Sequence, residues 1–110
     1  MPPVRQPERR RHRRVRMKQG LRVRATNPKD PQFEEISTTK DVSQDGIYFV
    51  TQLDVYAEGM RVYVTVPYHS PNSPQNYHYL GQVTRLDALA NNQKGVAINF
   101  LSSAEKPTQN

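Results

Sequence analysis

Short runs in which apolar and polar residues alternate dominate residues 20–102. The clearest run covers residues 60–66, where Val62, Val64 and Val66 occupy every second position. Successive side chains of a strand point to opposite faces, so this period predicts strands that bury one face. No segment has the pattern of an amphipathic helix of useful length. The chain is therefore predicted to build its core from strands alone.

The alternation predicts six strands, separated by turn signals rich in proline, glycine, asparagine and aspartate. They cover residues 21–26, 33–42, 47–51, 60–66, 77–86 and 95–101. In the second strand, Ile36 and Val42 are expected on the same face, and one helical turn is expected at residues 88–90. Such strands with hairpin-length connections are typical of a small antiparallel barrel or a sandwich. We favour a six-stranded barrel, because closure leaves no exposed sheet edges.

Positive charge is concentrated in the first 19 residues, which we call the N-terminal arm. The arm holds eight of the sixteen lysines and arginines and one acidic residue, a net charge of +7, whereas residues 20–110 come to −1. Prolines at positions 2, 3 and 7 oppose a helix there. We expect a flexible arm (1–19), one barrel domain (20–102) and a polar tail (103–110), in a chain long enough for a single domain.

Seven of the eight cations in the arm are arginine, with Arg9, Arg10 and Arg14 at its centre. The guanidinium group is planar, offers paired donors and stacks on aromatic faces. This preference favours planar, bidentate or stacked recognition of an anionic partner over contact with phosphate alone. Judged by charge alone, however, a basic tail that binds polyanions without selectivity is the favoured interpretation of the run.

A second constellation occupies the end of the second predicted strand. Asp41 and Ser43 are two residues apart and are expected to project together from the outer surface, while Val42 enters the core. A carboxylate and a hydroxyl in this arrangement can read donors on a ligand. Gly46 permits a positive φ or a close backbone approach. All three are also common turn residues, so an ordinary hairpin is the simpler interpretation when they are taken alone.

The two constellations in this order resemble the signature of the PilZ domain, a bacterial receptor for cyclic di-GMP. The family pattern is RxxxR followed one strand later by D/NxSxxG. Arg10 and Arg14 match the first motif, and Asp41, Ser43 and Gly46 match the second. The similarity extends through the predicted strands to about Ser102. Many PilZ domains continue into a helix, but a short polar tail with Pro107 predicts little or no helix here.

The resemblance implies a receptor or adaptor without enzymatic activity. Arg10 and Arg14 would hold guanine and phosphate, Asp41 and Ser43 would read a guanine edge, and Gly46 would keep the turn tight. Family members with arginine at the position of Arg9 often bind a stacked ligand pair, so two cyclic di-GMP molecules per chain are expected. The arm would become ordered around the ligand, and the signal would pass to a protein partner in trans.

Two rival interpretations remain. The arm could make the chain a nonspecific nucleic-acid-binding protein, or the domain could be a degenerate PilZ module that binds only proteins. The chain has no cysteine and its histidines lack ligand spacing, so neither a metal nor another cofactor is expected. Without the apolar run of a signal peptide or a membrane span, a cytoplasmic location is expected.

Overall fold

The fold was analysed in a computed structural model that describes residues 15–16 and 18–102. These residues form seven strands, and no helix occurs among them. The strands are β1 (Val15–Arg16), β2 (Gly20–Ala25), β3 (Glu34–Val42), β4 (Gly46–Thr51), β5 (Arg61–Thr65), β6 (His78–Ala88) and β7 (Lys94–Phe100). Accordingly, this part of the chain includes no helix that could cross a membrane.

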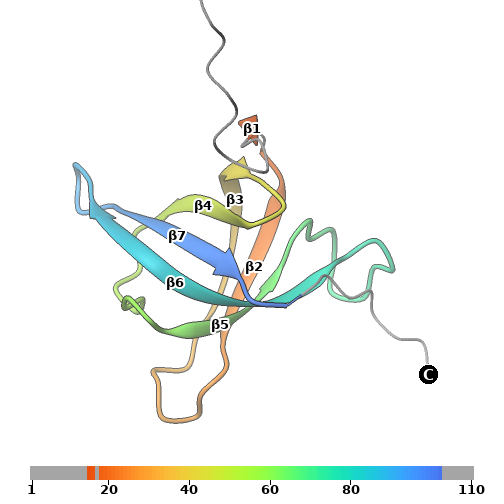
Figure 1. The fold of residues 1–110 in the computed structure, drawn as a ribbon, viewed down its shortest axis with the longest axis horizontal. Helices are drawn as coiled ribbons and strands as arrows, with labels where there is room; N and C mark the ends of the chain where they lie inside the picture. Colours follow the sequence, from red (N-terminus) through yellow and green to blue (C-terminus); the bar gives the residue numbers. More distant parts are fainter. Residues whose placement is uncertain (1–14, 17, 103–110) are drawn as a thin grey trace, which may run out of the picture.

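Strands β2 to β7 close into a barrel, as Figure 1 shows. The hydrogen-bonded order is β3-β2-β5-β6-β7-β4, the pairing of β3 with β4 completes the ring, and every pairing is antiparallel. The predicted six-stranded antiparallel barrel is confirmed. The tail expected after Ser102 lies outside the described residues.

The barrel interior is filled by apolar residues of β2, β4, β5, β6 and β7 and of the segments that flank β5. Its core consists of Leu21, Val23, Ile47, Phe49, Tyr56, Met60, Val62, Val64, Val66, Val83, Val96 and Ile98. Valine dominates this set because branched side chains pack well on a pleated surface. The alternation seen in the sequence therefore fixed which face of most strands is buried.

Two local expectations were wrong. Residues 88–90 form no helical turn, because β6 continues to Ala88 and the chain reverses directly into β7. Ile36 and Val42 do not share a face, since Ile36 is 59% exposed whereas Val42 packs against the core. The register between β3 and β4 shifts between Thr39 and Asp41, so Lys40 is an extra residue in β3. Such a β-bulge inverts the alternation beyond it.

A polar cluster ties the buried Tyr56 to the barrel wall. The Tyr56 hydroxyl donates a hydrogen bond of 2.6 Å to Glu35, and the Thr51 hydroxyl donates one of 2.7 Å to the other oxygen of the same carboxylate. The Tyr56 ring makes edge contacts with Phe33 and Phe49. Burial, followed by the hydrogen bond to Glu35 and its negative charge, raises the pKa of Tyr56 far above that of a free tyrosine.

The raised pKa of Tyr56 predicts a loss of stability at alkaline pH. The unfolded chain ionises this tyrosine near pH 10, whereas the folded domain keeps it neutral, so the stabilisation is complete below pH 10 and falls as the pH rises above that value. In urea unfolding, the stability advantage of the wild type over Tyr56→Phe should shrink by about 1.4 kcal/mol per pH unit above pH 10. A difference that stays constant from pH 8 to pH 11.5 would contradict this account.

Candidate functional site

Strand β1 lies beside the end of β3 at one end of the barrel (Figure 1). Val15 pairs with Val42, and Arg16 pairs with Asp41. Val15 directly follows Arg14, the last residue of the RxxxR motif, and Val42 lies within the DxSxxG motif. The pairing therefore places the residue that follows the first motif beside the second motif. Arg9, Arg10 and Arg14 themselves lie outside the described residues.

The junction between β1 and β2 is held against β3 by Gln19 and Thr39. The backbone amide of Thr39 donates to the carbonyl of Gln19, and the amide of Gln19 donates to the Thr39 hydroxyl at 3.0 Å. Thr39 is almost completely buried, with 1% of its surface exposed. The described end of the arm thus continues the line of β2 along β3.

Asp41 lies on the outer face of the barrel, as expected. Its cross-strand partner is Tyr48, and directly opposed residues of an antiparallel pair project from the same face. Tyr48 stands between the buried Ile47 and Phe49 and therefore points outward. The bulge at Lys40 sets this direction, because strict alternation from the buried Thr39 would turn Asp41 toward the core.

Ser43 shapes the turn between β3 and β4. Its hydroxyl accepts hydrogen bonds from the backbone amides of Asp45 at 3.1 Å and Gly46 at 3.2 Å, while its own amide donates to the carbonyl of Gly46. The geometry of Ser43 is therefore that of a turn residue. Such bonds fix the backbone on which the outward-facing Asp41 is carried.

A glycine is required at position 46 because the neighbouring strand leaves no room for a side chain. It pairs with Asn99 of β7, and a Cβ at this position would overlap the carbonyl oxygen of Ile98. Of the two roles considered from the sequence, the close backbone approach applies, since Gly59 is the glycine with a positive φ in the described chain. The second motif thus consists of an outward carboxylate, a turn-forming hydroxyl and a tight strand contact.

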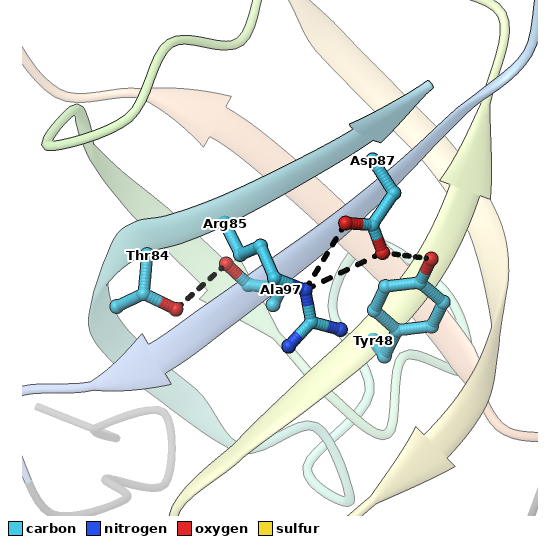
Figure 2. A network of polar contacts seen from close by, with 5 residues as sticks. All are labelled: Tyr48, Thr84, Arg85, Asp87 and Ala97. Carbon is cyan, nitrogen blue, oxygen red and sulfur yellow. Dashed lines mark hydrogen bonds and ion pairs between the residues drawn. The ribbon is translucent and has the colours of Figure 1, made fainter. Parts of the chain in front are cut away.

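Next to Asp41, the outer face carries a polar network that the sequence did not reveal (Figure 2). The Tyr48 hydroxyl donates to Asp87 at 2.9 Å, and the Arg85 Nε donates to the same carboxylate at 3.2 Å. The Arg85 guanidinium carbon lies 5.5 Å from the centre of the Tyr48 ring. An open hollow of about 390 Å³ adjoins the network and is lined by Lys40, Asp41, Tyr48, Val50 and Leu89.

The network fixes the protonation of both its acidic members. The hydrogen bond from Tyr48, followed by the hydrogen bond and charge of Arg85, lowers the pKa of Asp87. Burial, followed by the hydrogen bond to Asp87, raises the pKa of Tyr48. At neutral pH the site therefore holds a carboxylate that accepts from both neighbours and a phenol that keeps its proton.

Comparison with known proteins identifies the family. The PilZ domain model matches residues 8–109, nearly the whole chain. The chain is a PilZ domain. At the level of the family, PilZ domains are receptors for cyclic di-GMP that act through protein partners.

A solved structure supports the same fold. The structure of the Bacillus subtilis inhibitor of motility, MotI/DgrA, superposes with a TM-score of 0.67 at 13% sequence identity. The match covers 94% of this chain and 48% of that protein, so the chain spans about half of its length. At this identity the likeness shows the fold alone. No curated protein sequence matches the chain.

Proposed function

We propose that this PilZ domain binds cyclic di-GMP between its N-terminal arm and the outer face of β3 and β4. The pairing of β1 with β3 is the observation that carries the proposal, because Val15, which directly follows the RxxxR motif, lies beside the DxSxxG motif. In the sequence, 26 residues (15–40) separate the two motifs. An ordinary hairpin beside an unrelated basic tail gives no reason for this pairing.

The ligand carries two phosphates and two guanines, and the residues near the junction suit both. Arginine donates to the O6 and N7 acceptors of guanine in a bidentate contact and also pairs with phosphate. We assign these contacts to Arg10 and Arg14, and the reading of the guanine N–H donors to Asp41. Ser43 and Gly46 hold the turn that presents Asp41.

We further propose that ligand binding orders the arm and that the ordered arm is read by a partner protein. Residues 1–19 carry a net charge of +7 and little apolar surface, so they gain few contacts until an anionic ligand arrives. The short β1 pairing anchors the near end of the arm at the site. Ligand binding would then create a new surface for the partner protein, formed by the ordered arm, without rearrangement of the barrel.

Calorimetric titration tests the proposal. Cyclic di-GMP should bind more tightly than cyclic di-AMP, and the preference should persist at high salt, because base reading does not depend on counterion release. A stoichiometry of two ligands per chain is expected from Arg9. Equal, steeply salt-dependent binding of both dinucleotides and of single-stranded DNA would instead support a nonspecific polyanion-binding arm.

A further inference from the structure

The outer face of the barrel carries a row of residues that begins at the proposed guanine reader. The register pairs Asp41 with Tyr48, Tyr48 with Ala97, and Ala97 with Arg85. These four residues therefore follow one another across β3, β4, β7 and β6, at strand spacings of about 4.8 Å. Side chains on neighbouring strands of such a row face the same side of the sheet.

Small residues on β7 leave the middle of this row flat. Ala97 is 8% exposed, and a Cβ at Gly95 would overlap the Tyr48 hydroxyl. The Tyr48 side chain can therefore extend over β7 and reach Asp87 on β6, as Figure 2 shows. A larger residue at position 95 would push the ring away from the sheet.

A second bulge turns Arg85 onto this surface. The register of β6 with β7 shifts between Val83 and Arg85, so Thr84 is an extra residue. Strict alternation from the buried Val83 would direct Arg85 to the core, whereas its side chain is 59% exposed. The Thr84 hydroxyl donates to the carbonyl of Ala97 at 3.3 Å, which fastens the bulge to β7.

The pair formed by Tyr48 and Arg85 is restrained on one side and exposed on the other. Asp87 accepts hydrogen bonds from the Tyr48 hydroxyl and from the Arg85 Nε, and both contacts leave the terminal guanidinium nitrogens directed away from the carboxylate (Figure 2). As an exposed ion pair, Arg85 with Asp87 contributes little to stability. Restraint of two planar groups does, however, reduce the entropy lost when a planar ligand stacks on them.

We propose that Tyr48 and Arg85 form a base-binding platform that determines specificity for guanine. The inference rests on the proposed binding of cyclic di-GMP and deepens it. One guanine enters the hollow between Asp41 and Leu89 and stacks on Tyr48, while Asp41 accepts from its N–H donors. Arg85 donates its terminal nitrogens to the O6 and N7 acceptors of that base. Asp87 acts as a positioning residue that keeps both planar groups in place.

Truncation of the platform tests the proposal. Tyr48→Ala and Arg85→Ala should each weaken cyclic di-GMP binding by roughly tenfold or more, as expected for loss of a stacking or bidentate base contact. Tyr48→Phe keeps the ring and should lose much less. The matched control is Tyr63→Ala, because Tyr63 on β5 is also exposed and also has an arginine, Arg24, 5.7 Å from its ring centre. That control should bind like the wild type.

The contact of Arg85 with N7 has its own test. A cyclic dinucleotide built from 7-deazaguanine lacks that acceptor and should bind the wild type less tightly than cyclic di-GMP. This difference should be smaller for Arg85→Ala, because one of the contacts with N7 has already been removed. If Tyr48→Ala and Arg85→Ala remain folded and bind cyclic di-GMP with wild-type affinity, the platform is overturned while the proposed function stands. If the wild type itself shows no preference for cyclic di-GMP, the proposed function fails first.

Discussion

Replacing Arg14 with alanine is expected to weaken cyclic di-GMP binding by roughly ten- to a hundredfold. Each hydrogen bond to a charged group contributes about 1.5–3 kcal/mol, and a tenfold change in affinity corresponds to about 1.4 kcal/mol. Arg14 directly precedes Val15, which pairs with Val42 beside Asp41. In the proposed site, the lost contact would lie next to the pairing of β1 with β3. Calorimetry at moderate salt measures the change in Kd.

The matched control is Arg5→Ala, which removes the same charge from the same arm. Steering by net charge affects both variants alike. If the arm acts only as a polyanion tail, the two substitutions will produce equal and small losses that disappear at high salt. A loss confined to Arg14→Ala shows that position along the arm matters more than its charge.

Replacing Gly46 with alanine is expected to lower both stability and ligand affinity. The added methyl group would overlap the carbonyl oxygen of Ile98, which belongs to the backbone of β7 and cannot rotate away. Moving two paired strands apart should cost roughly 1–3 kcal/mol, as overpacking does elsewhere. The turn that Ser43 forms with Gly46 would shift with them and misplace Asp41. Urea unfolding measures the loss of unfolding free energy, which appears as a lower midpoint with an unchanged m-value.

The variant Gly59→Ala separates the loss of stability expected for Gly46→Ala from the loss of ligand affinity. Gly59 has a φ of +89° with no atom within 4 Å of an added Cβ, so alanine there is strained by its backbone conformation alone. It lies in the connection between β4 and β5 and belongs to neither motif. This variant should lose stability and keep wild-type affinity for cyclic di-GMP. Equal losses of affinity in both variants would show that binding simply follows global stability.

The strands and most of the core could be predicted from the sequence because each strand buries one face. A valine at every second position between Val62 and Val66 places these side chains inside the barrel whatever the neighbouring strands are. The second motif was also recognisable, since a serine and a glycine at fixed spacing are what a tight turn needs. The role of Arg9, Arg10 and Arg14 stays a prediction, because they lie outside the described residues.

The platform could not be predicted, because it depends on two bulges and on pairing between distant strands. Counted from the buried Thr39 and Val83, a period of two turns Asp41 and Arg85 toward the core. The outward direction expected for Asp41 followed from its neighbour Val42, which lies beyond the bulge. One extra residue in each strand reverses these assignments, and nothing in the local sequence marks where a strand will slip against its partner.

The sequence by itself therefore determined the strands, their buried faces and the two motifs, because these follow from local periodicity and turn chemistry. Only the tertiary structure decided that β1 pairs with β3 beside the second motif and that Tyr48, Arg85 and Asp87 form one surface beside Asp41. The physical reason is that barrel closure sets the register between strands that are far apart in the chain. That register aligns residues 41, 48, 97 and 85 in a single row.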